Sequence, residues 1–174
     1  MRYHDITKDD MKNGDGLRVV LWVAGCDHGC EGCHNPVTWD PTGGLEFDDA
    51  AKKELFAQLD QPYISGVTIS GGDPLFMGNR LDMRELVQEI KDYAPDKTIW
   101  LYTGYLYEEI HMEPVLEWID VLVDGPFILE QRDTTLHWKG SYNQRVIDMK
   151  KTRQEGRVCL WDDADGRKNE DNQN

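Results

Sequence analysis

Three of the four cysteines in this chain, Cys26, Cys30 and Cys33, fall within eight residues in a C-x₃-C-x₂-C spacing. A small secreted domain held together by disulfides would spread its cysteines along a shorter chain. The first residues also contain no apolar stretch of the kind that a signal peptide needs. We therefore expect a cytoplasmic protein with reduced thiols, in which a tight thiol cluster indicates a bound metal.

Two kinds of metal site suit three cysteines at this spacing. A 4Fe–4S cluster would take one thiolate on each of three irons and leave the fourth iron free to bind a small molecule. A structural zinc ion would need a fourth ligand, which His28 or His34 could supply. Gly29 and Gly32 are the residues a loop needs if its backbone must wrap a cluster closely. The cysteines alone leave both sites open.

The cysteine loop follows a buried strand. Residues 17–24 form an apolar, β-branched run without helical periodicity, which ends at Gly25. Further strand patterns follow at 66–70, 98–103, 119–123 and 145–148, with helical patterns at 47–59, 83–90 and 106–111. This alternation predicts βα units around a parallel sheet. Because such sheets bind ligands at the carboxyl ends of their strands, the position of the loop favours a cluster over zinc.

A glycine pair follows the second strand pattern, in Ser70-Gly71-Gly72-Asp73-Pro74. Paired glycines let backbone groups come within hydrogen-bond reach of a ligand because no Cβ stands in the way. The neighbouring carboxylate of Asp73 can offset a cationic group such as a ligand ammonium. An ordinary turn would explain the same residues, but a three-cysteine loop one βα unit earlier favours a binding site.

Length and charge narrow the class of protein. With 174 residues, the chain is too short for a complete eight-fold α/β barrel, which usually needs about 250 residues. Nineteen basic residues against thirty-three acidic ones give a net charge of −14, which argues against binding to nucleic acid. No apolar run approaches the roughly 20 residues of a membrane span, so we expect no membrane-embedded segment.

Together these features resemble the radical S-adenosylmethionine (SAM) superfamily, in which a C-x₃-C-x₂-C loop follows the first strand and Gly-Gly-Asp or Gly-Gly-Glu follows the second. More narrowly, the chain is similar to the activating proteins of the anaerobic (class III) ribonucleoside-triphosphate reductase. The similarity covers roughly residues 1–148 and rests on these motifs, in order: Asn13-Gly14-x-Gly16-x-Arg18, the cysteine loop with Asn35 and Thr38-Trp39, Ser70 to Leu75, Trp100 to Tyr105, Val121 to Gly125, Trp138 to Ser141, and Asn143-Gln144.

The resemblance implies an α/β fold of the radical SAM type, an incomplete (open) TIM-like barrel with a mostly parallel sheet. It implies one 4Fe–4S cluster on Cys26, Cys30 and Cys33, with SAM bound to the fourth iron. Reductive cleavage of SAM would then yield a 5′-deoxyadenosyl radical, which removes a hydrogen atom from a glycine near the C-terminus of the partner reductase. The family also implies an electron donor such as reduced flavodoxin.

The resemblance also assigns SAM contacts. They are Gly32, Cys33 and His34 in the cysteine loop and Gly71, Gly72 and Asp73 after the second strand. The chain departs from the family at one of these positions, because the reductase activators usually carry Tyr just after the third cysteine, where this chain has His34. We expect the imidazole to stack on the adenine of SAM.

We also make predictions for the domain bounds, the tail and several residues outside the two motifs. Residues 1–149 are expected to form the activating domain, and residues 150–174 a charged, flexible tail with Cys159 as a free thiol. Aromatic residues near loops are candidates to line the site or meet the partner: Trp39, Tyr102, Tyr105 and Trp138. Trp22 and Trp100 lie in apolar runs and are expected in the core. Asp124, which ends the fourth strand pattern, is a candidate SAM or partner contact.

Two other functions stay open. One is a radical SAM enzyme that acts on a different glycyl-radical enzyme or on a small heterocycle. The other is a non-enzymatic adaptor with a Cys₃His zinc site, which would be colourless and contain no iron or sulfide.

Overall fold

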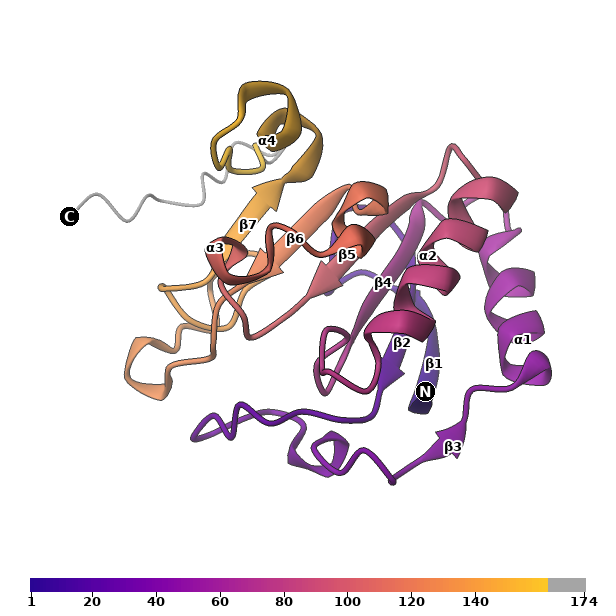
Figure 1. The fold of residues 1–174 in the computed structure, drawn as a ribbon, viewed down its shortest axis with the longest axis horizontal. Coiled ribbons are helices and arrows are strands. Elements are labelled where there is room, and N and C mark those ends of the chain that lie inside the picture. The colour runs from indigo at the N-terminus through magenta and orange to yellow at the C-terminus, as the bar shows by residue number, and fades with distance from the viewer. Residues whose placement is uncertain (163–174) are drawn as a thin grey trace.

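The computed structural model describes residues 1–162 and is built on a seven-stranded mixed sheet (Figure 1). The strands, in the spatial order β3-β1-β2-β4-β5-β6-β7, are β1 (Arg2–Asp10), β2 (Arg18–Val23), β3 (Leu45–Glu46), β4 (Gly66–Gly71), β5 (Thr98–Tyr102), β6 (Val121–Asp124) and β7 (Arg145–Asp148). The central strands β2, β4, β5 and β6 are parallel, whereas β1, β3 and β7 pair antiparallel.

The sheet is open, because β3 and β7 form two separate edges in the described part of the chain. Three of its six strand pairings are parallel and three are antiparallel. The sheet therefore contains more antiparallel pairing than the mostly parallel sheet that we expected. The parallel part coincides with the β-branched runs of the sequence, since strands covered on both faces need apolar side chains on both. The assignment to an incomplete TIM-like barrel stays a prediction.

The N-terminal strand β1 is absent from the sequence-based prediction. It pairs antiparallel with β2, and Ile6 is its one buried residue. An antiparallel strand near a sheet edge can expose most of its side chains, so it lacks the continuous apolar run that marks the central strands.

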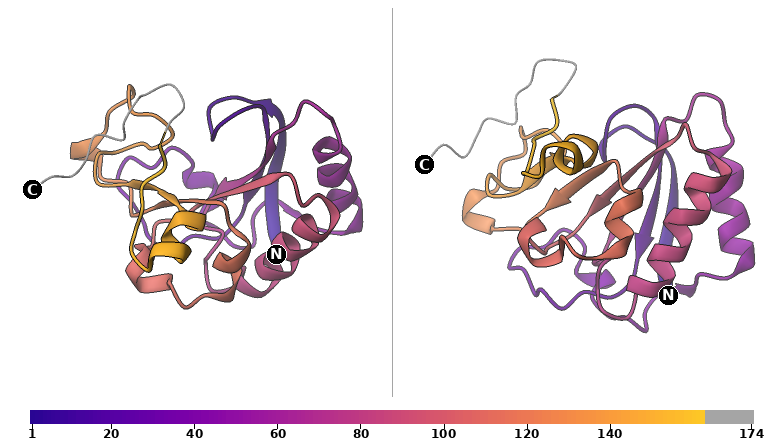
Figure 2. Two further views of the ribbon diagram at one scale, coloured as in Figure 1. Left: turned by 90° about the horizontal axis from the view of Figure 1, so that it is seen from above. Right: turned by 45° about the horizontal axis from the view of Figure 1, so that its top comes forward.

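Two long helices, α1 (Asp49–Leu59) and α2 (Arg80–Tyr93), lie side by side on one face of the sheet (Figure 2). The Asp48 side chain caps α1 by accepting a hydrogen bond of 2.9 Å from the N–H of Ala51. Shorter helical segments complete the chain: η1 (Pro36–Thr38), α3 (Tyr107–Ile110), η2 (Pro114–Trp118), η3 (Leu129–Gln131) and α4 (Met149–Glu155).

Alternate strand residues pack on opposite faces of the sheet. The helix-covered face, which carries Leu21, Ile69 and Leu101, belongs to the larger apolar core with α1 and α2. The opposite face carries Trp100, and we call it the Trp100 face. A smaller cluster covers it: Val121, Val123, Trp138 and Val146, with Tyr102 and Trp161 packed against them.

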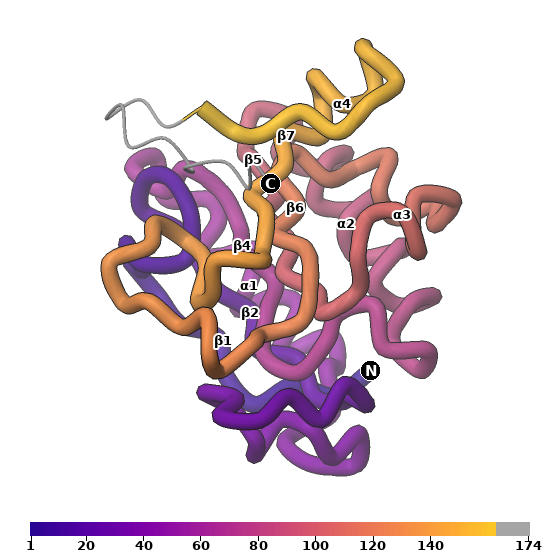
Figure 3. The backbone as a smooth tube through the Cα atoms, turned by 90° about the vertical axis from the view of Figure 1, so that its left-hand side faces the viewer, coloured from indigo at the N-terminus to yellow at the C-terminus, as the bar shows by residue number. Residues whose placement is uncertain are grey.

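The first part of the expected tail is folded onto the sheet. Residues 149–155 form α4, and Leu160 makes an antiparallel bridge to Ile147 of β7 (Figure 3). Trp161 then packs edge-on against Trp100, with ring centroids 5.6 Å apart. Residues 150–162 therefore differ from a flexible tail, and residues 163–174 lie outside the described part of the chain. Within residues 1–162, the helices are too short or too polar to cross a membrane.

Candidate functional site

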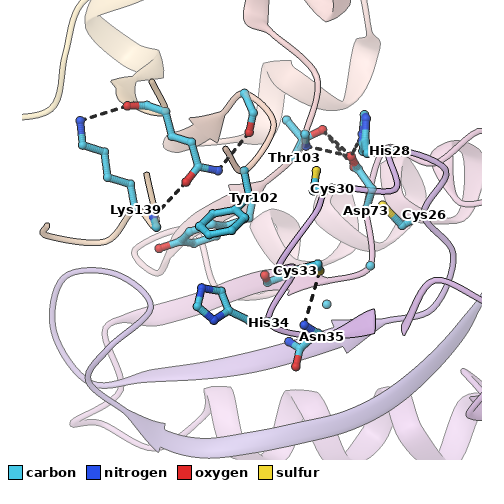
Figure 4. A pocket seen from close by; sticks show the side chains of 18 of the residues that line it. Cys26, His28, Cys30, Cys33, His34, Asn35, Asp73, Tyr102, Thr103 and Lys139 are labelled. Carbon is cyan, nitrogen blue, oxygen red and sulfur yellow. Dashed lines mark hydrogen bonds and ion pairs between the residues drawn. The ribbon is translucent and has the colours of Figure 1, made fainter. Parts of the chain in front are cut away.

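The three clustered cysteines border one pocket of about 370 Å³ at the carboxyl ends of β2, β4 and β5 (Figure 4). Cys26, Cys30 and Cys33 are all partly exposed. Gly71 and Gly72, from the end of β4, line the same pocket. The structure thus brings together the two motifs that the sequence analysis singled out.

The cysteine loop is tied back to the end of β2 by its own backbone. Gly25 N–H donates to the carbonyl of Thr38 over 2.8 Å, and Cys26 N–H donates to that of Trp39 over 3.1 Å. Within the loop, Gly29 and Gly32 take positive φ angles of 60° and 72°, which only glycine adopts without strain. These bonds and turns hold the three cysteines at one end of the sheet.

A backbone N–H group donates to one of the sulfurs, because Asn35 N–H lies 3.4 Å from Cys33 Sγ. Burial raises the pKa of the Cys26 thiol to about 11. Metal binding takes the thiolate form, so loading a metal on this loop releases protons.

The donor set fits a cluster better than a single ion. In residues 1–162, no three His, Cys, Asp or Glu side chains lie close enough together to hold one metal ion. Cysteines that each bind a different iron of a cluster need not meet at one atom. Both candidate zinc ligands have other neighbours: His28 Nε2 lies 2.6 Å from Asp73 Oδ2, and the His34 ring packs edge-on against Phe127 at 5.2 Å.

The glycine pair lets the end of β4 press against the base of the cysteine loop. A Cβ at Gly71 would lie 2.5 Å from the backbone of Val23, and one at Gly72 would lie 2.5 Å from the carbonyl oxygen of Gly25. Gly72 N–H donates to the Val23 carbonyl over 2.8 Å. The two glycines are therefore required by close backbone packing between β2 and β4, whatever they contact in the pocket.

Asp73 lines the same pocket, and its carboxylate is held by groups of the protein. Its side chain is 1% exposed, and its carboxylate accepts hydrogen bonds from Thr103, from His28 and from two backbone N–H groups. The hydrogen bond to Asp73 raises the pKa of His28. The carboxylate thus belongs to a network within the protein.

Comparisons with known proteins place this chain in a family. Residues 12–147 match the family model described as a 4Fe-4S single cluster domain. The anaerobic ribonucleoside-triphosphate reductase-activating protein of Enterobacteria phage T4 is 41% identical over 166 residues, which is 95% of this chain and 97% of the relative. Proteins of the same name from Vibrio cholerae serotype O1 and Escherichia coli K12 are 43% and 41% identical over 150 residues, covering 84% of this chain and 97% of each relative.

The chain belongs to the family of anaerobic ribonucleoside-triphosphate reductase-activating proteins. This confirms the resemblance inferred from the motifs. It also confirms the 4Fe–4S cofactor at the level of the domain, because the matched region contains Cys26, Cys30 and Cys33.

The remaining expected contacts of this activating protein fall into two groups. His34, Trp39, Tyr102 and Trp138 line the pocket together with the cysteines. Outside the pocket lining, a Cβ at Gly32 would lie 2.8 Å from Leu129, and Asp124 is buried in an ion pair with Arg145. Tyr105 packs edge-on against the His28 ring, with centroids 4.5 Å apart. SAM contacts at Gly32, His34, Gly71, Gly72 and Asp73 stay predictions.

Some residues of the site were missed from the sequence. Trp22, expected in the core, lines the pocket and donates from its indole N–H to Thr7 over 2.6 Å. Phe127 reaches the pocket from the connection between β6 and β7, which follows a Gly-Pro turn without periodicity. Thr103 belongs to the motif from Trp100 to Tyr105, but its hydrogen bond to Asp73 has no signal in the sequence because it joins residues 30 positions apart.

Proposed function

We propose that this chain activates an anaerobic ribonucleoside-triphosphate reductase by generating its glycyl radical, through reductive cleavage of SAM at a 4Fe–4S cluster. The observation that carries the proposal is the placement of Cys26, Cys30 and Cys33 around one pocket at the carboxyl edge of the sheet. Relatives at 41–43% identity are named activating proteins of this reductase, and they are covered almost end to end.

In this function the cysteines would hold three irons of the cluster, and the fourth iron would be left for SAM. When bound, the cluster and SAM together would supply the 5′-deoxyadenosyl radical that abstracts hydrogen from glycine. The protein contributes position and shielding: the Asn35 backbone N–H donates to Cys33 Sγ, and the Trp22, Trp39 and Trp138 rings line the pocket.

We place SAM in the same pocket, beside Cys33. Gly71 and Gly72 would offer it backbone groups, and His34 is exposed next to the third cysteine, where a ring could stack on adenine. Gly32 would contribute from the loop backbone. We take the main role of Asp73 to lie in the protein network that holds this loop.

The open sheet suits a protein substrate. We interpret it as an incomplete TIM-like barrel, in which the unclosed side would admit the glycine segment of the reductase. The three cysteines are partly exposed, which suits electron transfer from a donor such as reduced flavodoxin. We expect the protein to act in the cytoplasm.

Anaerobic reconstitution tests the proposal. The chain is loaded with iron and sulfide, reduced, given SAM, and assayed for 5′-deoxyadenosine. We expect about four irons per chain and deoxyadenosine that depends on the reductant. A chain that holds no iron and makes no deoxyadenosine would contradict the proposal, and one that holds zinc without iron would favour the adaptor.

A radical SAM enzyme with another target would pass this first assay. It is distinguished by adding the reductase and recording the electron paramagnetic resonance (EPR) signal of a glycyl radical. Deoxyadenosine formation without that signal would assign the activity to another glycyl-radical enzyme or to a small heterocycle.

A further inference from the structure

The buried carboxylate of Asp73 is satisfied by four donors from three separate segments. Oδ1 accepts the Leu75 N–H over 2.8 Å and the Thr103 hydroxyl over 2.9 Å. Oδ2 accepts the Gly104 N–H over 2.9 Å and lies 2.6 Å from His28 Nε2. A carboxylate has about four lone-pair sites. Asp73 therefore uses its acceptor capacity to join the ends of β4 and β5 to the cysteine loop.

His28 is the member of this network that lies inside the metal-binding loop, midway between Cys26 and Cys30. Its ring is fixed from several sides, because Tyr105 packs edge-on at 4.5 Å and a Cβ at Gly104 would lie 2.5 Å from the ring. Since a carboxylate only accepts hydrogen bonds, Nε2 carries the proton of the His28–Asp73 bond.

His28 links the sheet to the two cysteines on either side of it in the chain. Its side chain is anchored to the buried carboxylate of Asp73, while its backbone lies two residues from each of Cys26 and Cys30. Ring orientation and backbone position in a short loop are coupled, so the anchor limits how far these two cysteines can move. Hydrogen bonds to cluster sulfurs are among the features that set a cluster's reduction potential.

We propose that Asp73 and His28 are positioning residues for the iron–sulfur ligands, which fix the Cys26–Cys30 part of the loop. The inference rests on the proposed cluster and deepens it. It differs from a role for the Asp73 carboxylate as a contact of the SAM ammonium, because the four donors around that carboxylate all come from the protein.

Substitutions at both ends of the bond test the proposal. Asp73→Asn presents an NH₂ group where donors already face the carboxylate, so at least one hydrogen bond is lost. His28→Leu removes the anchored ring, whereas His28→Gln keeps a donor of similar reach. Outer partners of metal ligands typically contribute about 10- to 100-fold in metal affinity. We expect about tenfold faster loss of iron to a chelator for Asp73→Asn and His28→Leu, with substantial rescue in His28→Gln.

The reduced cluster gives a second readout, recorded without SAM. A cysteine loop that is held less firmly changes the solvent exposure and the hydrogen bonds of the cluster sulfurs, so we expect a shifted midpoint potential and an altered EPR spectrum. If Asp73 and His28 act through their mutual hydrogen bond, the double variant should lose iron no faster than whichever single variant loses it faster. Gly104→Ala is an independent probe, because it keeps the backbone donor but places a Cβ against the His28 ring.

Asp124→Asn is the matched control. Asp124 is also a buried carboxylate at the carboxyl edge, but it is paired with Arg145 and accepts the N–H of Tyr107. We expect this variant to lower the unfolding temperature while keeping wild-type iron retention, potential and EPR spectrum. Circular dichroism of each apoprotein shows which variants keep the fold, and Asp73→Asn is compared with Asp124→Asn at matched folded fraction.

The outcomes separate this inference from the proposed function. Asp73→Asn could keep wild-type iron retention, potential and EPR spectrum and show only weaker SAM binding. That result would overturn the positioning role and favour a direct contact between the carboxylate and SAM. Equal cluster loss in Asp124→Asn would also overturn it, because the effect would then follow from general destabilisation. A wild-type chain that takes up no cluster would instead contradict the proposed function itself.

Discussion

The two faces of the sheet bury side chains of different kinds at similar depth. On the helix-covered face, Leu21, Ile69 and Leu101 have no exposed surface and contact apolar neighbours in the larger core. On the Trp100 face, Arg18 is equally buried, and its guanidinium lies 5.4 Å from the centre of a Trp100 ring. Burial lowers the pKa of Arg18 to about 10, so it stays charged at neutral pH.

The difference lies in how the buried polar group is satisfied. Arg18 donates to the Thr68 hydroxyl over 2.8 Å and to the carbonyls of Val67 and Thr98 over 2.8 and 2.9 Å. The Trp100 face then continues to the pocket, where Tyr102 and Trp138 join the lining. The helix-covered face thus supplies stability, while the opposite face and the carboxyl edge carry the site. Substitutions in the two regions should therefore have separable effects.

The largest expected effect is at the cysteine loop. Cys30→Ala removes one of three cluster ligands from a partly exposed position, so we expect complete loss of the cluster and of SAM cleavage. The unfolding free energy of the apoprotein should change by no more than about 0.5 kcal/mol. Iron and sulfide analysis with urea unfolding measures both. Wild-type iron content in Cys30→Ala would refute the ligand assignment.

The reverse effect is expected on the helix-covered face. Leu101→Ala leaves a cavity in a fully buried part of the core and should cost about 2–5 kcal/mol of unfolding free energy. Iron per folded chain should stay at the wild-type value. Urea unfolding and metal analysis of the folded fraction check this, and a cluster lost from chains that remain folded would show that the two regions are not separable.

Gly72→Ala tests where the two regions meet. The added Cβ would lie 2.5 Å from the Gly25 carbonyl oxygen and 2.8 Å from that of Thr38, so the base of the cysteine loop must shift. Such overpacking typically costs about 1–3 kcal/mol, and we expect weaker cluster retention. Gly156→Ala is the control, because its φ is also positive, its Cβ meets no atom within 4 Å, and it ends α4 rather than lying in the cysteine loop. Iron retention that is equal in the two variants would contradict the packing role of Gly72.

The smallest effect is expected at Cys159. Its Sγ lies 3.4 Å from Glu155 Oε2, beside α4, and the residue follows the α4 segment rather than the cysteine loop. Cys159→Ala should leave iron content and SAM cleavage unchanged and cost on the order of 1 kcal/mol or less. Metal analysis of this variant decides the point, since loss of iron would make Cys159 a fourth ligand.

Much of the fold could be predicted because its signals are local. The apolar run of β2 and the stripe of α2 at Met83, Leu86, Val87 and Ile90 identify elements whose burial follows from their own sequence. β1 has no such signal, because a polar strand near the edge of the sheet is stabilised by pairing with β2. The docking of Trp161 on Trp100 likewise depends on a partner 61 positions earlier.

The residues of the site also divide into those with a local sequence signal and those whose role depends on distant partners. Cys26, Cys30, Cys33 and the glycine pair were predictable because their spacing is itself the signal. The environment of Asp73 was not, because Thr103 and His28 reach it only after three strand ends have been brought together. Gly32 illustrates the same limit, since its close neighbour Leu129 lies almost 100 positions further along the chain.

The most direct measurement is the EPR spectrum of the reductase after anaerobic incubation with the reconstituted chain, a reductant and SAM. We expect a glycyl-radical signal that requires SAM, is present with Cys159→Ala and is absent with Cys30→Ala. A reductase that stays free of the radical while the wild-type chain carries its cluster and cleaves SAM would contradict the assignment of this chain as its activator.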